Sequence, residues 1–218
     1  MTRWPLVLCL VGCGGDDGAS KQSTPLTNWD GSDTGAQDPD DPDDPDETGA
    51  ITVDVEDFCE PIAEGACMLP WPSDRYLRKK SSNVTGYRIA YDADAAWKNT
   101  DGVSVKVSTF SRLDGFSPSS QILTIFDEPV DTDGTAFWDS IELSLEEDHP
   151  TVLVDLETGE RLAHWVETDA RATDPEETVF FIRPTVRLKA DRRYGVAIRG
   201  LKGISGAPIS SSAAFKAM

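Results

Sequence analysis

Four cysteines are the residues of this 218-residue chain whose type and spacing allow the most chemistry. A cysteine thiol can accept an acyl chain, form a disulfide or bind a metal ion. Cys9 and Cys13 lie close to the N-terminus, whereas Cys59 and Cys67 are separated by a short stretch that contains a proline and a glycine. A metal site needs further ligands at short spacing, and the nearest histidine is His149. An even number of cysteines in the folded part of an exported protein indicates disulfide bonding. Cys59 and Cys67 are therefore predicted to be bonded to each other.

The residues before Cys13 indicate export. A basic start is followed by an apolar run over residues 4–11, which suits the hydrophobic region of a signal peptide. Leu10-Val11-Gly12-Cys13 resembles the lipobox of bacterial lipoproteins. The resemblance implies that residues 1–12 are removed, that Cys13 carries the lipid in the cell envelope, and that Gly14 favours the outer over the inner membrane. Because the run is short and contains Pro5, a mis-assigned start codon or a cytosolic protein with an apolar N-terminus stays open.

The segment after Cys13 has an abnormal charge density. Residues 14–50 contain eleven acidic residues and one lysine, and most of the others are Gly, Ser, Thr and Pro. Low hydrophobicity with high net charge cannot offset the entropy of ordering, so residues 13–50 are predicted to form a disordered tether. Proline and charge repulsion keep such a chain extended, with a reach on the order of 100 Å.

The overall charge excludes some partners. The chain has 39 acidic and 20 basic residues and a formal net charge of −19. This balance argues against nucleic acid and against electrostatic docking on anionic lipid. After residue 11 no stretch approaches the roughly 18 consecutive apolar residues of a membrane-spanning helix. Membrane attachment is therefore predicted to depend on Cys13.

Residues 51–218 predict a single all-β module. Short apolar runs alternate with turn signals about every ten residues, which is typical of an antiparallel β-sandwich. The runs over residues 151–156 and 161–166 are separated by a short turn that contains Glu157-Thr158-Gly159, which indicates a β-hairpin. Only residues 91–100 suggest a helical turn. The predicted strands are Val103–Val107, Ile122–Phe126, Ile141–Leu145, Thr151–Leu156, Arg161–Val166, Thr178–Ile182 and Tyr194–Ile198.

Three separated stretches carry a second resemblance. The first is Leu69-Pro70-Trp71-Pro72-Ser73-Asp74, which follows Cys67. The second is Leu113-Asp114-Gly115-Phe116-Ser117, before a predicted strand, and the third runs from Arg183-Pro184 to Phe215. Their order and spacing are similar to those of the N-terminal Ig-like domain of bacterial virulence-factor-type surface lipases.

That resemblance implies an exported, often lipidated protein whose Ig-like domain precedes an α/β-hydrolase domain. Here the sequence stops at Met218, where the hydrolase would begin. No catalytic residue of the family can be transferred, because the matching positions are not in this sequence.

The chain's own residues do not make a hydrolase site either. Such a site needs a serine in a G-x-S-x-G turn and a histidine later in the chain. The sequences around Ser117 and Ser205 both lack the final glycine of this motif, and no histidine follows Ser205. His149, in an acidic loop, is predicted to be solvated, and His164 is predicted to lie on a sheet face. Residues 131–134 lack the later ligands of a calcium loop, so we expect no catalytic residue, metal or cofactor.

The sequence therefore predicts a lipid-anchored cell-envelope lipoprotein with a non-catalytic Ig-like accessory or interaction module. Its expected partners are the membrane, through Cys13, and a downstream hydrolase or an envelope protein. One alternative is the N-terminal fragment of a split or truncated surface lipase or esterase. Another is a carbohydrate-binding or adhesion domain, because flat aromatic rings can stack on sugars, although core packing also explains them. The tryptophans concerned are Trp71, Trp97, Trp138 and Trp165.

Overall fold

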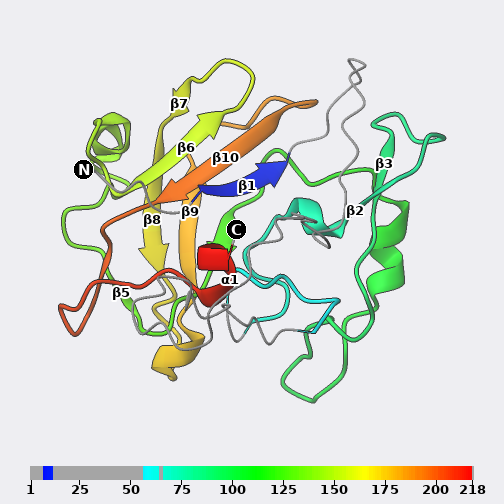
Figure 1. Cartoon of the computed structure of the whole chain (residues 1–218), viewed down its shortest axis with the longest axis horizontal. Helices are drawn as coiled ribbons and strands as arrows, with labels where there is room; N and C mark the ends of the chain where they lie inside the picture. The colour runs from blue at the N-terminus through cyan, green and yellow to red at the C-terminus, as the bar shows by residue number, and fades with distance from the viewer. Residues whose placement is uncertain (1–6, 12–55, 64–65, 218) are drawn as a thin grey trace, which may run out of the picture.

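The computed structural model of this chain describes residues 7–11, 56–63 and 66–217 (Figure 1). Over these ranges the chain is built mainly of short antiparallel strands, and its helices are short. The predicted tether of residues 13–50, including the lipidation residue Cys13, lies outside the described residues, as do residues 51–55 of the predicted module. Among the residues described, no helix is long and apolar enough to cross a membrane.

The first sheet has four antiparallel strands in the order β1-β10-β6-β7. Burial alternates along β6, where Thr151, Leu153 and Asp155 are buried, as expected for a strand with one face on a core. Val196 of β10 lies opposite Leu153 in this register. The strands are β1 (Val7–Val11), β6 (Thr151–Asp155), β7 (Arg161–Leu162) and β10 (Arg193–Ile198).

The second sheet is antiparallel in the order β4-β9-β8, with β4 (Ile122–Thr124), β8 (His164–Thr168) and β9 (Phe180–Pro184). Strands β6 and β10 cross over β8 and β9 in Figure 1, so the two sheets form two layers. Side chains from both sheets share one apolar core, and the predicted all-β, antiparallel sandwich is confirmed. The buried core residues are Ile122, Val130, Leu153, Val166, Phe180, Ile182, Tyr194, Val196, Ile198 and Leu201.

The chain passes between the layers just after the predicted hairpin. Strands β6 and β7 pair with each other, and the turn between them contains Gly159 at a φ of +72°, a conformation that suits glycine. The carboxylate of Asp155 accepts a hydrogen bond from the N–H of Glu157 in the same turn, at 2.9 Å. The hairpin is thus confirmed, but the predicted strand over residues 161–166 is divided at Ala163 between the two sheets.

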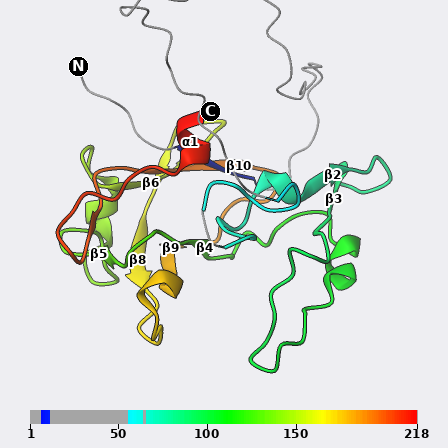
Figure 2. The ribbon, with the colours of Figure 1, turned by 60° about the horizontal axis from the view of Figure 1, so that its bottom comes forward.

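A smaller lobe lies to one side of the two layers (Figure 2). This side lobe (residues 68–120) contains the hairpin of β2 (Leu77–Lys79) and β3 (Tyr87–Ile89) and two 3-10 helices, η1 (Asp74–Tyr76) and η2 (Val107–Arg112). Tyr76, Ile89 and Phe116 form a separate buried cluster there. The remaining elements are β5 (Val130–Asp131), η3 (Ile141–Leu145), η4 (Pro175–Glu177), β11 (Lys202–Gly203) and α1 (Ala213–Ala217).

Two predicted strands and one predicted helical turn are wrong. Residues 103–107 form only an isolated bridge, between Ser104 and Lys98, because no further strand pairs with them before η2 begins. Residues 141–145 are the 3-10 helix η3, in which Ser144 is fully buried whereas Leu145 is 46% exposed. The hydroxyl of Ser144 accepts a hydrogen bond from the N–H of His164, so a polar side chain faces the interior. Residues 91–100 form bends and turns rather than helix.

Strand β1 falls within the predicted export signal. It pairs with β10 from Val7, opposite Ala197, to Val11, opposite Arg193. Removal of residues 1–12 would take this strand away and leave β10 at the edge of the first sheet. Signal cleavage would therefore have a consequence for β10 that can be measured.

Candidate functional site

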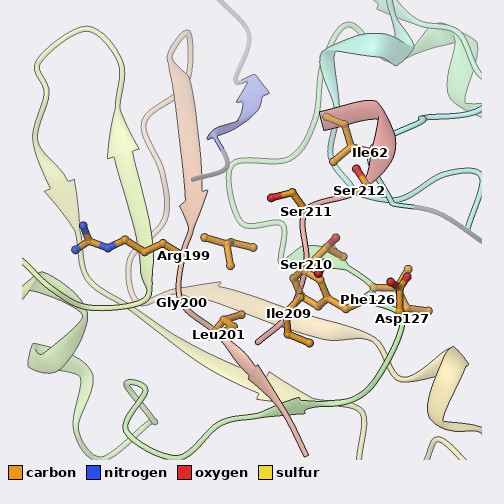
Figure 3. A pocket seen from close by; sticks show the side chains of 13 residues that line it. Ile62, Phe126, Asp127, Arg199, Gly200, Leu201, Ile209, Ser210, Ser211 and Ser212 are labelled. Atoms are coloured by element: carbon orange, nitrogen blue, oxygen red, sulfur yellow. The ribbon is translucent and has the colours of Figure 1, made fainter. Parts of the chain in front are cut away.

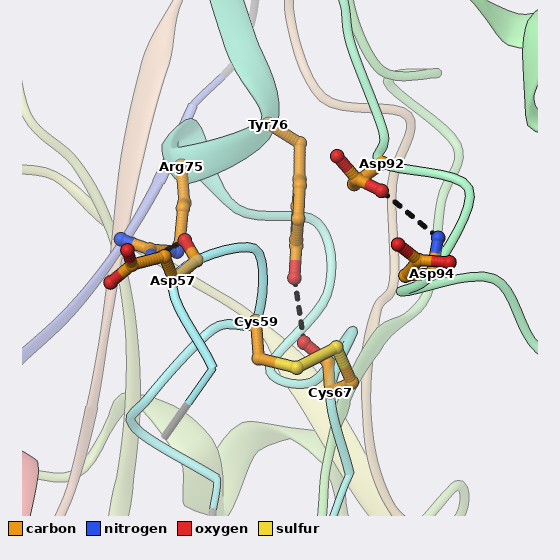
Figure 4. Close-up of a disulfide and its surroundings, with 7 residues drawn as sticks. All are labelled: Asp57, Cys59, Cys67, Arg75, Tyr76, Asp92 and Asp94. Carbon is orange, nitrogen blue, oxygen red and sulfur yellow. Dashed lines mark hydrogen bonds between the residues drawn. A yellow bond between two sulfur atoms is a disulfide. The ribbon is translucent and has the colours of Figure 1, made fainter. Parts of the chain in front are cut away.

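The predicted disulfide between Cys59 and Cys67 is present (Figure 4). The two Cα atoms are 4.4 Å apart. Tyr76 of η1 is 2% exposed and donates its hydroxyl hydrogen to the carbonyl oxygen of Cys67 at 2.7 Å. Burial raises the pKa of Tyr76 to about 12, so this hydroxyl keeps its proton at neutral pH. The disulfide loop is thereby fastened to the side lobe.

A buried carboxyl group strengthens this junction. Glu60 is 6% exposed, and its Oε2 accepts a hydrogen bond from the hydroxyl of Ser73 at 2.5 Å. Its backbone N–H donates to the carbonyl oxygen of Cys67 at 2.8 Å. Burial raises the pKa of Glu60, an effect that the Ser73 hydrogen bond and the nearby Arg75 partly offset. Glu60 therefore joins the disulfide loop to residues 69–74.

The first signature segment (residues 69–74) contacts both sheets. The backbone N–H of Trp71 donates to the carbonyl of Leu123 in β4 at 2.9 Å, and Leu123 donates in return at 2.8 Å. The peptide bonds before the two prolines of this segment are cis. At its end, Asp74 forms an ion pair with Arg193 of β10 at 3.0 Å. Burial raises the pKa of Asp74, and Arg193 opposes that rise.

The second signature segment (residues 113–117) lies against the first. Thr85, near the β2–β3 hairpin, donates its hydroxyl hydrogen to the carbonyl oxygen of Asp114 at 2.6 Å. Phe116 is 8% exposed, and its ring contacts that of Trp71 edge to face, with the ring centroids 5.8 Å apart. The structure thus brings together the two segments that were singled out in the sequence.

An apolar pocket of about 220 Å³ lies where these segments meet. Of the residues in the two signature segments, Trp71, Leu113, Gly115, Phe116 and Ser117 line it, and the others do not. Its walls come from Met68 and Trp71 and from residues in the ranges 89–91, 96–97, 105–113 and 115–120. The sequence did not predict the wall formed by residues 91–110, because it indicated a helical turn over 91–100 and a strand over 103–107 there. The one relevant signal was the large aromatic side chain of Trp97.

The polar atoms in this pocket are largely paired. Trp71 donates its ring N–H to the hydroxyl of Tyr91 at 3.0 Å. Burial raises the pKa of Tyr91, a rise that the Trp71 hydrogen bond partly opposes, and its ring contacts that of Phe110 with centroids 5.6 Å apart. The hydroxyl of Ser117 accepts a hydrogen bond from the N–H of Ser119 at 3.2 Å. The surface that faces the pocket is therefore mostly carbon.

The two histidines lie together in the sandwich, and the prediction that His149 is solvated is wrong. His149 is 4% exposed; its Nε2 accepts from the N–H of Ala136 at 2.8 Å, and its Nδ1 lies 2.8 Å from the carbonyl of Thr151. The acidic residues 146–148 face solvent, but the histidine that follows them is buried, because it lies two residues before the buried Thr151 that begins β6.

His164 completes this cluster. It is fully buried on the inner face of β8, with Nε2 2.7 Å from the hydroxyl of Thr151 and Nδ1 2.9 Å from the carbonyl of Leu162. Burial is the main cause that lowers the pKa of His164 to about 4, so the ring is neutral at physiological pH. The nitrogens of both rings contact backbone groups and the buried hydroxyl of Thr151, not the hydroxyl of Ser117 or Ser205.

Other sequence candidates lie apart from the pocket. Ser205 hydrogen-bonds Glu128 through its hydroxyl at 3.0 Å, and Asp131 accepts from the N–H of Asp133 in a turn. Trp138 is 62% exposed and contacts only Phe137 among the aromatic rings described. Within the described ranges no group of three or more His, Cys, Asp or Glu residues could hold a metal ion.

A second pocket lies beside the sandwich core (Figure 3). Ile62, Phe126, Leu201 and Ile209 line it together with the serines of residues 210–212. Its volume is about 80 Å³, which accommodates a few water molecules. The larger pocket of the side lobe is therefore the candidate functional site.

No family model, curated protein or solved structure matches this chain. The resemblances to lipoproteins and to surface lipases stay hypotheses from the sequence. The side-lobe pocket is therefore interpreted from its own geometry.

Proposed function

We propose that the chain is a lipid-anchored cell-envelope lipoprotein whose β module is a non-catalytic accessory or interaction module. The observation that carries the proposal is the disulfide between Cys59 and Cys67. Disulfides persist in oxidising compartments outside the cytoplasm, so this bond supports export. The Leu10-Val11-Gly12-Cys13 sequence then supplies the anchor. A lipoprotein cysteine carries more than one acyl chain, which suffices for stable attachment.

The side-chain geometry supports a module without hydrolytic activity. A serine hydrolase requires a serine within hydrogen-bond reach of a base. His149 and His164 use their ring nitrogens in structural hydrogen bonds, and Ser117 and Ser205 contact other groups. We therefore expect the purified protein to release no product from short-chain esters, and sustained ester hydrolysis would contradict this part of the proposal.

Cell fractionation tests the anchor. Cys13→Ala should move the protein from the membrane to the soluble fraction. Cys9→Ala is the matched control, because Cys9 lies in the same N-terminal region yet is not expected to carry lipid. Membrane retention of the Cys13→Ala variant, or equal release of both variants, would contradict lipid anchoring at Cys13.

One observation favours a second candidate, the N-terminal part of a surface lipase or esterase. The two signature segments contact each other through Trp71 and Phe116, as parts of one domain would. Sequencing the DNA beyond codon 218 tests this candidate. A hydrolase with a G-x-S-x-G turn there, in frame or frameshifted, would support it, and unrelated sequence would exclude it.

A further inference from the structure

We propose that the side-lobe pocket binds the alkyl or acyl chain of an amphiphile and leaves its polar head group in water. The pocket is formed entirely by residues of the side lobe. The proposal does not depend on lipid anchoring at Cys13, and it gives the module a ligand class of its own.

The pocket has the size for a hydrocarbon group. Its volume is about 220 Å³. An apolar protein cavity of about 150 Å³ stays dry and binds benzene, so this pocket can hold a hydrocarbon larger than a single ring. Aromatic and aliphatic side chains supply most of its walls, which is typical of ligand pockets.

The mouth of the pocket is also apolar. Trp97, Val105 and Leu113 line it and are 46%, 42% and 43% exposed. Large apolar side chains that lie together on the surface often mark a binding site, whereas single exposed apolar residues are normal. The pocket is partly open to solvent, and these three lining residues are the exposed apolar ones, so a chain can enter beside them while its head group stays outside.

The hydrogen-bonding pattern distinguishes a hydrocarbon from a sugar. The indole N–H of Trp71 is already used by the hydroxyl of Tyr91, and this hydroxyl retains a single hydrogen to donate. A sugar ring carries several hydroxyls, and each one that loses water without gaining a partner weakens binding. A methylene chain makes no such demand and gains from leaving water.

Two valines in one exposed segment provide a matched pair of variants. Val105 lines the pocket, whereas Val103 does not, and their exposed fractions are 42% and 62%. Val105→Asp places a charge at the mouth, where an apolar ligand would have to cover it. Val103→Asp makes the same chemical change two residues earlier. Ala96→Phe, which fills the pocket with carbon, provides a variant without added charge.

The test is calorimetric titration of the full chain with decanoate, octyl glucoside and glucose, each alkyl probe below its micellar concentration. All variants carry Cys13→Ala, so that no attached lipid competes. We expect one decanoate or octyl glucoside per chain and no binding of glucose. Val105→Asp and Ala96→Phe should weaken binding at least about tenfold, and Val103→Asp less than about twofold.

Several results would overturn the proposal. These are no saturable binding of either alkyl probe, binding of glucose as tight as that of octyl glucoside, or equal losses in Val105→Asp and Val103→Asp. Circular dichroism of each variant identifies one that fails to fold, in which case the other pocket variant decides. Because Cys13 is replaced throughout, failure of this test leaves the anchoring test unaffected.

Discussion

Trp71 and Phe116 contact each other edge to face, with ring centroids 5.8 Å apart and ring planes at 81°. Trp71 belongs to a segment that pairs with β4, and Phe116 follows η2 on the far side of the β2–β3 hairpin. The ring contact therefore lies within the side lobe, next to the backbone pairing of Trp71 with Leu123 that joins the lobe to the sandwich, and it forms part of the pocket wall. The same two side chains serve both the stability of the lobe and the shape of its pocket.

Truncation of Phe116 should be costly. Phe116 is 8% exposed and belongs to the buried cluster of the side lobe, so Phe116→Ala should lower the free energy of unfolding by about 3–5 kcal/mol. Phe137→Ala is the control. Because Phe137 is 44% exposed, this substitution should lower the free energy of unfolding much less. Urea unfolding measures both, and similar losses would show that the Phe116 contact contributes little.

Reduction of the disulfide should destabilise the same region. A cross-link with a sequence separation of 8 removes conformational entropy from the unfolded chain worth about 2–3 kcal/mol. Urea unfolding with and without a thiol reductant should reveal this difference in the wild type. A Cys59→Ser, Cys67→Ser variant should be insensitive to the reductant, and an equally insensitive wild type would contradict the expectation.

Stability should fall in mild acid because of His164. Its pKa is about 4 when folded and 6.5 as a free side chain, so between these values the unfolded chain binds a proton that the folded chain excludes. The free energy of unfolding should therefore decrease as pH falls from about 6.5 to 4, by on the order of 3 kcal/mol. The buried carboxyl of Glu60 acts in the opposite direction, because its raised pKa favours the folded state as pH falls.

A non-titrating variant isolates the histidine. His164→Asn keeps a polar group at the site but cannot bind the proton, so its unfolding free energy should depend less on pH between 4 and 6.5 than that of the wild type. The same pH dependence in both proteins would show that His164 is not the group responsible.

Strand β10 should respond to removal of the signal. It pairs with β1 on one side and β6 on the other. Hydrogen exchange can compare the precursor, kept intact by Cys13→Ala, with a chain that starts at residue 13. The amides of β10 that face β1 should exchange faster in the shorter chain, while those that face β6 stay protected. Unchanged exchange throughout β10 would contradict the pairing with β1.

The sandwich could be predicted from sequence because its strands combine apolar residues that face the core with at least one neighbouring strand to pair with. Residues 151–155 alternate, and their inner face packs against the second sheet. The same alternating pattern led to a wrong strand prediction at residues 141–145. There Ser144 is buried rather than the apolar side chains, and its hydroxyl accepts a hydrogen bond from the N–H of His164. Alternation reports strand propensity, but it does not show whether a neighbouring strand is present to pair with.

The candidate site could be predicted only in part. Trp71 and Phe116 stood out through the resemblance, yet their contact depends on how the β2–β3 hairpin folds back, which no local pattern encodes. Tyr91, Trp97 and Val105 complete the pocket from a segment without regular structure. The burial of His149 was missed because the three acidic residues before it dominate the local composition.

Intact-mass spectrometry of the protein extracted from bacterial membranes tests the central claim most directly. Lipid anchoring requires a chain that starts at Cys13, lacks residues 1–12 and carries the added mass of more than one acyl chain. A chain that starts at Met1 with an unmodified Cys13 would contradict the account.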